Sequence, residues 1–352
     1  MKNEEKHIEK CLKALVQNGF GDNGINGEII LVDTGSTDNS LSIAGKYLNK
    51  IYHFDWVNDF SKAKNYSISL AQYKYVLIID ADEYMTTLDK FSIQQFMDKT
   101  PNYIGQIKRF NQVIADGIEA THIDYTERLF NKNLFHFKGT IHEQVVPINP
   151  VSFDYTQLNI CIDHDGYLLS QEQLNEKAAR NNILLFEQLK KEPYNPYIHF
   201  QIGQSYMMMR DIKSAAENFA NGLACNCDPT LEYVQMMITS YGTCLLDLEE
   251  YDKALSLLDY YDEFASCAEF VFMAGNIYLN TNQPILAYKE YLRCLSMKNE
   301  RTVGTTSFFP LHNIGVINEM LGDSDSAISF YQKAADLGYE RSKNRLKELL
   351  NK

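Results

Sequence analysis

The stretch YVLIIDADE, residues 75–83, decides the fold class of the first half of this chain. It places five bulky apolar residues directly before an acidic cluster, and the stretch EIILVD at residues 28–33 has the same form. Strands that are apolar on both faces are typical of a parallel sheet that helices cover on both sides. In such sheets ligands bind at the carboxyl ends of strands, so we expect Asp33, Asp80 and Asp82 to lie at a ligand-binding edge.

Segments with helical spacing separate these strands. Residues 5–16, 40–48 and 60–71 carry apolar side chains at the spacing of one helix face, and residues 51–54 read as one more short strand. This alternation of strands and helices predicts an α/β domain with a mainly parallel, Rossmann-like sheet.

The second half of the chain follows a different rule, because strand signals vanish from residue 172 on. One pattern occurs four times: a glycine, an alanine twelve positions later, and a large apolar residue four positions after that. This spacing resembles the tetratricopeptide repeat, which folds as an all-α solenoid of helical hairpins. We expect the glycine and alanine to let two helices approach closely, and the large residue to fill the gap to the next hairpin. The triplets are Gly203/Ala215/Phe219, Gly242/Ala254/Leu258, Gly275/Ala287/Tyr291 and Gly315/Ala327/Tyr331.

The composition argues against several classes of protein. Of the 352 residues, 33 are Lys or Arg and 46 are Asp or Glu, which gives a net charge of −13. So acidic a chain is a poor candidate for binding nucleic acid or anionic membranes, both of which need clustered positive charge. No apolar run is long enough to span a membrane, the first residues are polar, and the seven cysteines form no CxxC pair. We expect a cytoplasmic protein with reduced cysteines and no targeting segment.

The first acidic motif, DTGSTD at residues 33–38, lies between an expected strand and an expected helix. The Asp33 carboxylate is suited to accept hydrogen bonds from a base or a ribose, and Gly35 allows close approach of the backbone. Ser36 and its neighbours could serve the same ligand, or they could cap the helix that follows.

The second acidic motif carries Asp80 and Asp82, which in an extended segment point to the same side. Two such carboxylates repel each other unless they share a cation, and hard oxygen ligands suit Mg²⁺ or Mn²⁺. A divalent cation between these aspartates and a substrate diphosphate is one interpretation, and a solvated acidic turn is the other.

Seven motifs stand in the order and spacing of one family. Together they resemble family 2 glycosyltransferases of the GT-A fold, and the last three resemble a branch of that family with a C-terminal tetratricopeptide domain. That branch includes bacterial S-glycosyltransferases that modify bacteriocin peptides. The motifs are KNEE (2–5), DTGSTD (33–38), WVNDFSKAKN (56–65), DADE (80–83), RLF (128–130), GTIHE (139–143) and HDGY (164–167).

This resemblance implies how the chain is organised and what it does. Residues 1–167 would form the GT-A glycosyltransferase domain, residues 168–194 a linker helix, and residues 195–352 a repeat domain of about four repeats. The domain would transfer a sugar with inversion from a nucleotide-sugar co-substrate, most simply a UDP-sugar, to a peptide, protein or glycan. The repeat domain would recruit this acceptor or mediate homodimerisation.

The resemblance also assigns residues to the donor. Asp33, Gly35 and Ser36 would hold the nucleoside part of the nucleotide-sugar, while Lys64 and Arg128 would pair with its diphosphate. A lysine offers a point charge where the family more often has the bidentate fork of an arginine, so the contact at position 64 is the weaker of the two.

The metal site follows from the same motifs. Asp80 and Asp82 would form the metal-binding pair for Mg²⁺ or Mn²⁺, with Asp82 nearest the ion and Asp80 also beside the nucleotide-sugar. His164 is a further candidate ligand, although a lone histidine is equally often a structural residue.

An inverting transfer needs one base that takes the proton of the acceptor. Glu143 is the favoured candidate, and His142 and Glu127 are weaker ones. His142 could instead be a metal ligand or a structural histidine.

The beginning of the sequence favours a different function. Members of the resembled family usually have an apolar strand just before the KNEE segment, and here Met1 stands in its place. From this we expect weak donor binding and an unpaired edge of the sheet. The alternative is therefore a repeat-based interaction scaffold with a degenerate, inactive transferase domain. The intact pairs Asp80/Asp82 and His142/Glu143 argue against it.

Overall fold

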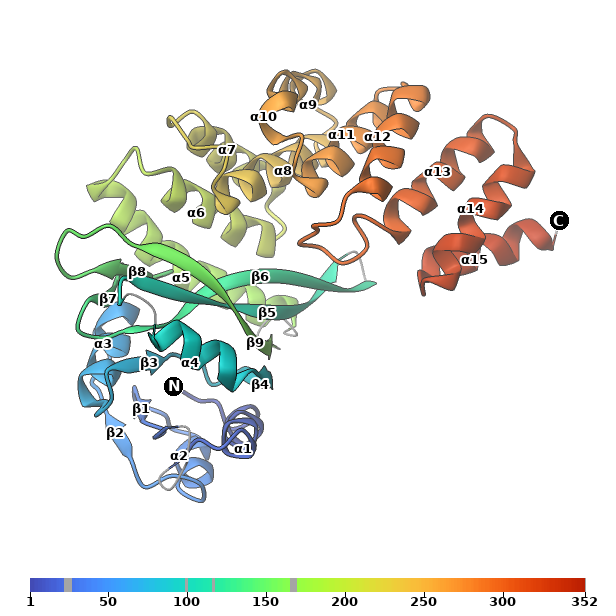
Figure 1. The fold of residues 1–352 in the computed structure, drawn as a ribbon. Coiled ribbons are helices and arrows are strands. Elements are labelled where there is room, and N and C mark those ends of the chain that lie inside the picture. Colours follow the sequence, from blue (N-terminus) through green and yellow to red (C-terminus); the bar gives the residue numbers. More distant parts are fainter. Residues whose placement is uncertain (22–26, 99–100, 116–117, 165–169, 352) are drawn as a thin grey trace. The chain divides into compact units, whose positions relative to one another are not determined.

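The chain folds into two compact units, Met1–Ser170 and Gln171–Lys352, drawn in sequence colours in Figure 1. The boundary predicted at residues 167 and 168, and the last three residues of the HDGY motif, fall outside the described residues. The computed structural model describes residues 1–21, 27–98, 101–115, 118–164 and 170–351.

The first unit contains one five-stranded sheet and two small two-stranded sheets. The strand order of the large sheet is β3-β6-β5-β9-β4, which can be followed in Figure 1. β1 (Leu31–Asp33) pairs with β2 (Ile51–His53), and β7 (Phe135–Lys138) pairs with β8 (Gln144–Pro147). The strands of the large sheet are β3 (Tyr75–Leu77), β4 (Glu83–Leu88), β5 (Tyr103–Ala115), β6 (Ile118–Asn131) and β9 (Asp154–His164).

The α/β fold class is confirmed, but the large sheet is mixed, whereas the sequence predicts a mainly parallel one. Among its described strands, β5 and β9 run parallel, and the other neighbours pair antiparallel. The difference comes from the pairing of β5 with β6: none of the seven motifs lies on β5, and the RLF motif lies only at the end of β6. Only two residues separate these long strands, and so short a connection requires an antiparallel pair. The predicted parallel pairing is present between β1 and β2.

Helices cover the sheets of the first unit and close its core. α1 packs against β4, α3 against β7, and α4 against β9. Most of the predicted apolar face of the first helix is buried: Ile8 and Leu12 are each 2% exposed and join a core that includes Ile160 and Ile162, whereas Val16 of that face is exposed. The helices are α1 (Ile8–Gln17), α2 (Ser40–Ala44), α3 (Phe60–Leu70) and α4 (Lys90–Asp98).

The second unit is helical, which confirms the predicted change of architecture. Its hairpins pair α6 with α7, α8 with α9, α11 with α12, and α13 with α14, and the alanines of all four triplets are fully buried. No helix in the described ranges is both long and apolar enough to cross a membrane. The α-helices are α5 (Gln171–Lys191), α6 (Pro196–Met208), α7 (Ile212–Leu223), α8 (Glu232–Asp247), α9 (Tyr251–Ser256), α10 (Tyr261–Phe264), α11 (Ala268–Asn280), α12 (Pro284–Ser296), α13 (Phe308–Met320), α14 (Ser324–Asp336) and α15 (Glu340–Leu350).

In three hairpins the large residue of the triplet covers the glycine of its own hairpin, whereas the sequence predicts that it fills the gap to the next one. A Cβ atom on Gly203 would lie 2.4 Å from the ring of Phe219, and one on Gly275 would lie 2.6 Å from the ring of Tyr291. The two helices cross so closely that only glycine leaves room for the ring.

The second hairpin departs from this pattern. After α9 the chain continues as a 3-10 helix, η1 (Leu257–Tyr260), which contains Leu258 of the triplet. Met273 from α11 fills the space over Gly242 instead, where a Cβ atom would lie 2.0 Å from its sulfur.

Candidate active site

The loop after β1 is organised around Asp33, which is 3% exposed. Its carboxylate accepts hydrogen bonds from the Gly35 amide at 3.0 Å, the Ser36 amide at 3.1 Å and the Ser36 hydroxyl at 2.5 Å. Burial raises the pKa of Asp33, but these hydrogen bonds outweigh it and hold the pKa below its usual value. Gly35 has a φ of 98°, which favours glycine. Ser36 therefore donates hydrogen bonds to Asp33 and does not cap α2.

The KNEE segment lies against this same loop. The Asn3 amide donates to the Ser36 hydroxyl at 2.9 Å, and the Thr37 amide donates to the Asn3 side chain at 2.8 Å. The Asn39 amide donates to the Glu5 carboxylate at 3.1 Å. Two motifs that are far apart in the sequence thus form one structure around the end of β1.

The DADE motif forms a turn, so the expectation of an extended segment is wrong. β3 ends at Leu77, and the Glu83 amide donates to the Asp80 carbonyl at 3.0 Å, which closes the turn. The Glu83 carboxylate in turn accepts from the Asp80 amide at 2.8 Å. Because the backbone turns here, Asp80 and Asp82 face different partners.

Asp80 lies between two cationic side chains. Lys64 Nζ is 3.2 Å from one carboxylate oxygen, and Arg128 Nη2 is 3.0 Å from the other. Burial raises the pKa of Asp80, but the charges of Lys64 and Arg128 outweigh it and hold the pKa well below its usual range. The structure thus brings together the three side chains that the resemblance assigns to the donor diphosphate and its surroundings.

Glu143, the predicted base, contacts the Asp80 cluster through an ion pair with Lys64. Lys64 Nζ is 2.7 Å from Glu143 Oε1, and Glu143 stands just before β8. His142 precedes it in the left-handed region, with a φ of 50°. The weaker candidate, Glu127, accepts a hydrogen bond of 2.9 Å from the side chain of Gln106, which lies on β5.

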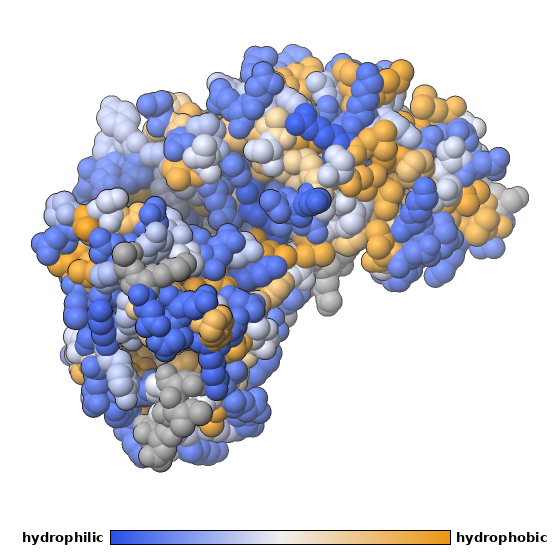
Figure 2. All heavy atoms as spheres, in the orientation of Figure 1, coloured by the Kyte–Doolittle hydropathy of each residue, from blue (hydrophilic) through white to orange (hydrophobic). Residues whose placement is uncertain are grey.

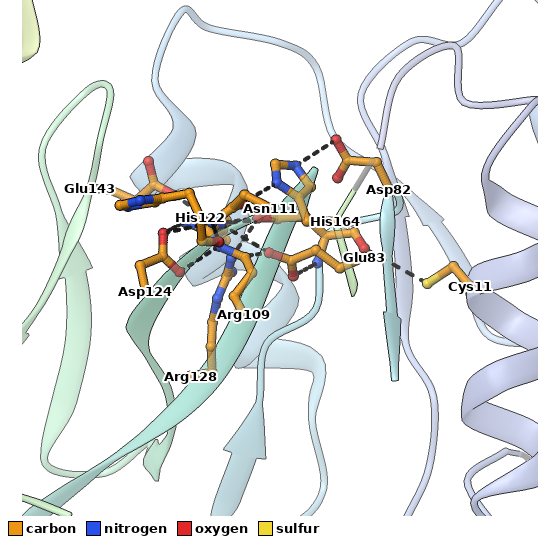
Figure 3. Close-up of polar contacts among 12 residues, drawn as sticks. Cys11, Asp82, Glu83, Arg109, Asn111, His122, Asp124, Arg128, Glu143 and His164 are labelled. Atoms are coloured by element: carbon orange, nitrogen blue, oxygen red, sulfur yellow. Dashed lines mark hydrogen bonds and ion pairs between the residues drawn. The ribbon is translucent and has the colours of Figure 1, made fainter. Parts of the chain in front are cut away.

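Behind the turn, Glu83 is fully buried and ion-paired. It lies 2.6 Å from Arg128 Nη2 and 3.2 Å from Arg109 Nη1. Arg109 in turn holds Asp124 with two hydrogen bonds, of 3.0 Å from Nε and 2.7 Å from Nη2. Figure 3 shows this chain of contacts across the strands.

On the other side of the turn, Asp82 faces His164, the last residue of β9. His164 Nε2 is 3.2 Å from Asp82 Oδ2, and His164 Nδ1 is 2.7 Å from Asn111 Oδ1 (Figure 3). Among the described residues, no group of three or more His, Cys, Asp and Glu side chains is arranged to hold a metal. A site here would therefore use Asp82 and His164, and substrate or water would supply the other ligands.

These two residues fit a small divalent cation. Two ligands at about 2.1 Å from an octahedral ion, at a right angle to each other, are about 3 Å apart. The observed separation of 3.2 Å between the nitrogen and the oxygen is close to that value. The charge of the surroundings agrees, because among the described residues the carboxylates whose contacts join this network outnumber its Lys and Arg groups by two. The carboxylates are Asp80, Asp82, Glu83, Asp124 and Glu143, and the cations are Lys64, Arg109 and Arg128.

Sequence analysis missed three members of this network: Arg109 and Asn111 on β5, and Asp124 on β6. No motif marks them. The one available signal is that polar side chains recur at every second position, at 109 and 111 on β5 and at 122 and 124 on β6, but both strands also carry polar residues on the other face. Which polar face meets which motif depends on strand register, and the sequence does not reveal it.

Comparison with known families divides the chain as the fold does. Residues 1–153 match the model of glycosyl transferase family 2. Residues 268–301 and 310–337 match the tetratricopeptide repeat, and these ranges cover the third hairpin and all but the first two residues of the fourth.

Individual proteins are similar to different parts of the chain. The SPbeta prophage-derived glycosyltransferase SunS of Bacillus subtilis (strain 168) is 26% identical over 306 residues, which cover 76% of this chain and 68% of that protein. The glycosyltransferase GlyG of Streptococcus pneumoniae serotype 4 is 33% identical over 86 residues, or 23% of this chain and 27% of that protein. The crystal structure of MamA covers 49% of this chain and 95% of MamA, at 18% identity and a TM-score of 0.40.

Proposed function

Because residues 1–153 form a family 2 glycosyltransferase domain and tetratricopeptide repeats follow it, we propose that this glycosyltransferase transfers a sugar with inversion from a nucleotide-sugar, most simply a UDP-sugar. The acceptor is a peptide, a protein or a glycan. One observation carries the proposal: the turn after β3 holds a cationic pair on one side and a carboxylate–histidine pair on the other.

Lys64 and Arg128 are the groups that would bind the donor diphosphate. Both contact Asp80, at 3.2 Å and 3.0 Å. Lys64 also contacts Glu143, and Arg128 also contacts Glu83. An ammonium has three donors and a guanidinium has five, so each side chain still has donor capacity for a phosphate oxygen beside its two carboxylates. Asp33 would accept hydrogen bonds from the nucleoside, in a loop that already fixes its carboxylate.

Asp82 and His164 would hold a divalent cation, Mg²⁺ or Mn²⁺. When bound, such an ion would neutralise the negative charge that develops on the departing diphosphate. The fit of this pair to neighbouring ligand positions, with a separation of 3.2 Å, supports this assignment.

Glu143 would take the proton of the acceptor, as the single base that an inverting transfer requires. Its ion pair with Lys64, at 2.7 Å, fixes the position of the carboxylate. His142 beside it is the alternative base, and replacing the two residues one at a time separates their roles.

The repeat unit would bind the acceptor or a second copy of the chain. Figure 2 shows hydrophobic side chains on the surface over α12–α14. Exposed apolar side chains of this kind mark surfaces that bind other proteins. The exposed large apolar residues of α12 and α13 are Ile285, Leu286, Leu292 and Met320. A hollow of about 450 Å³ is lined by His312, Val316, Glu319, Met320, Tyr331 and Arg345.

Hydrolysis of nucleotide-sugars in the presence of Mn²⁺ tests the proposal. A panel of donors is incubated with the wild type, with Asp82→Asn and with Asp98→Asn, an exposed aspartate on α4 that serves as the matched control. We expect at least one donor to be hydrolysed by the wild type and the control, and roughly a hundredfold slower by Asp82→Asn. Equal turnover by the wild type and Asp82→Asn would contradict the proposed binding of a catalytic metal by Asp82. No turnover of any donor would favour the interaction scaffold.

A further inference from the structure

The register of the large sheet places four polar residues in one row. His122 on β6 is opposite Asn111 on β5, which is opposite His164 on β9, which is opposite Glu83 on β4. Arg109 stands two positions before Asn111, on the same face of β5. Residues held by strand register have precise positions, so the contacts in this row are built into the fold.

Within this row, the hydrogen bonds of the Asn111 side chain allow one orientation of its amide. Its Nδ2 lies 3.2 Å from Asp124 Oδ2 and 3.3 Å from the His122 carbonyl oxygen, and both are acceptors. A flipped amide would place its oxygen against a carboxylate and a carbonyl, with repulsion at both contacts. Asn111 Oδ1 therefore faces His164, and it is an acceptor.

This orientation determines the proton on His164. Asn111 Oδ1 lies 2.7 Å from His164 Nδ1, so Nδ1 must carry the hydrogen and donate it. A neutral ring then has an unprotonated Nε2, which is the atom 3.2 Å from Asp82 Oδ2. With a neutral ring, two lone-pair atoms would face each other at this distance, and either a proton on Nε2 or a metal cation bound to both atoms would relieve their repulsion.

We propose that Asn111 is a positioning residue, whose side-chain oxygen holds the Nδ1–H tautomer of His164 so that Nε2 and Asp82 together form a seat for a divalent cation. The binding of a cation by Asp82 and His164 rests on the proposed function, whereas the assignment of the His164 tautomer does not. Histidines that bind metals are commonly oriented in this way by an acceptor on the second ring nitrogen.

Asp124 and Arg109 extend the same support. Arg109 holds Asp124 through two parallel hydrogen bonds and also contacts buried Glu83 at 3.2 Å. Asp124 is thereby fixed as the acceptor for Asn111. Burial raises the pKa of Asp124, but Arg109 outweighs it, and the net shift of the pKa is downward. Asp124 therefore accepts hydrogen bonds as a carboxylate at neutral pH.

Two readouts test this role without measuring catalysis. Nitrogen-15 NMR of histidine-labelled protein at pH 8.5 reports which ring nitrogen of His164 carries the proton, and His164→Gln identifies its signals. The electron paramagnetic resonance signal of free Mn²⁺ gives the Mn²⁺ affinity in the absence of a donor. Asn111→Leu removes the acceptor. Gln112→Leu is the matched control, because it makes the same change one position along β5, at a side chain that bonds Thr121.

We expect the Nδ1–H tautomer in the wild type and in Gln112→Leu. Asn111→Leu should lose this tautomer and bind Mn²⁺ ten- to a hundredfold more weakly. The double variant Asn111→Asp with Asp124→Asn exchanges the two groups at constant charge, and it should recover both properties to within about threefold of the wild type if the acceptor matters.

An Nε2–H tautomer in the wild type would overturn the proposal, whether or not any variant folds. So would an Asn111→Leu variant that keeps the wild-type tautomer, or one that keeps Mn²⁺ affinity within threefold of a wild type that binds the ion. A wild type that has the Nδ1–H tautomer, changed in Asn111→Leu, but does not bind Mn²⁺ would remove the metal from the proposed function and support the role of Asn111 in orienting His164.

Discussion

The two units of this chain fill their interiors in opposite ways. The first unit buries charge: Asp33, Glu83 and Arg128 are all less than 5% exposed. In the second unit, none of the buried residues in the described part of the chain is Asp, Glu, Lys or Arg, and the hairpins are closed by glycine, alanine and aromatic rings. Burying charge costs free energy unless each group is paired. The comparison indicates that the first interior is built for chemistry and the second for stability.

We expect the largest effect from a substitution that removes one buried charge from the first unit. Glu83→Gln leaves Arg128 and Arg109 without their shared buried carboxylate, and we expect the free energy of unfolding to fall by about 3 to 5 kcal/mol. Urea denaturation of the two proteins measures this. Glu340→Gln, which removes an exposed carboxylate paired with Lys343, should leave stability unchanged. A loss below about 1 kcal/mol for Glu83→Gln would show that the buried pairs do not support the fold.

The next effect concerns the close packing of the second interior. Gly275→Ala places a Cβ atom 2.6 Å from the ring of Tyr291, so the ring must shift, and we expect a loss of about 1 to 3 kcal/mol. Gly45→Ala is the control, because its Cβ atom comes no closer than 3.4 Å to the Leu41 carbonyl oxygen. Equal urea midpoints for Gly275→Ala and the wild type would mean that the hairpin tolerates a wider spacing.

A third test distinguishes the two units by the pH range in which their buried groups affect stability. Burial lowers the pKa of His312, on α13, from 6.5 to about 4. Between pH 6.5 and 4, His312 is therefore protonated in the unfolded chain and neutral in the folded one. The free energy of unfolding falls by about 1 to 3 kcal/mol as the pH is lowered across this window. The lowered pKa values of Asp33 and Asp124 act in another window: their stabilisation is complete above about pH 4 and is lost as the pH falls further.

His312→Gln should flatten the upper pH window and leave the lower one in place. Thermal unfolding at steps between pH 7 and 3, followed for the wild type and the variant, measures both windows. An unchanged slope between pH 6.5 and 4 would contradict the assignment to His312.

The smallest expected effect lies in the turns of the hairpins. Glu249 and Asn282 occupy these turns with φ values of 58° and 59°. Asn tolerates this left-handed conformation, whereas Glu does not. Relief of the left-handed strain is partly offset by the conformational entropy that glycine loses on folding. Glu249→Gly should therefore raise the melting temperature by an amount that corresponds to about 0.5 kcal/mol. Asn282→Gly should change it by less, and a larger gain for Asn282→Gly would contradict this explanation.

The repeat unit is the part of the molecule that the sequence predicts best, because its signal is local. Gly275 and Tyr291 are sixteen positions apart and meet within one hairpin. The site is predicted less completely, since its partners are distant: Arg128 and Glu83 are 45 positions apart, and His164 and Asp82 are 82 apart. Motifs identified several members of the site, but Asn111 and Asp124 lie outside every motif, and the sequence does not give the register that brings them to the site.

The most direct test of the account is calorimetry of UDP binding with and without Mn²⁺, on the wild type and on Asp82→Asn. Because Asp82 and His164 lie 3.2 Å apart beside the cationic pair, we predict that Mn²⁺ raises the UDP affinity of the wild type at least tenfold, and that Asp82→Asn loses this gain while keeping the affinity measured without Mn²⁺. UDP affinity that does not depend on Mn²⁺, or that responds to Mn²⁺ equally in both proteins, would contradict the account.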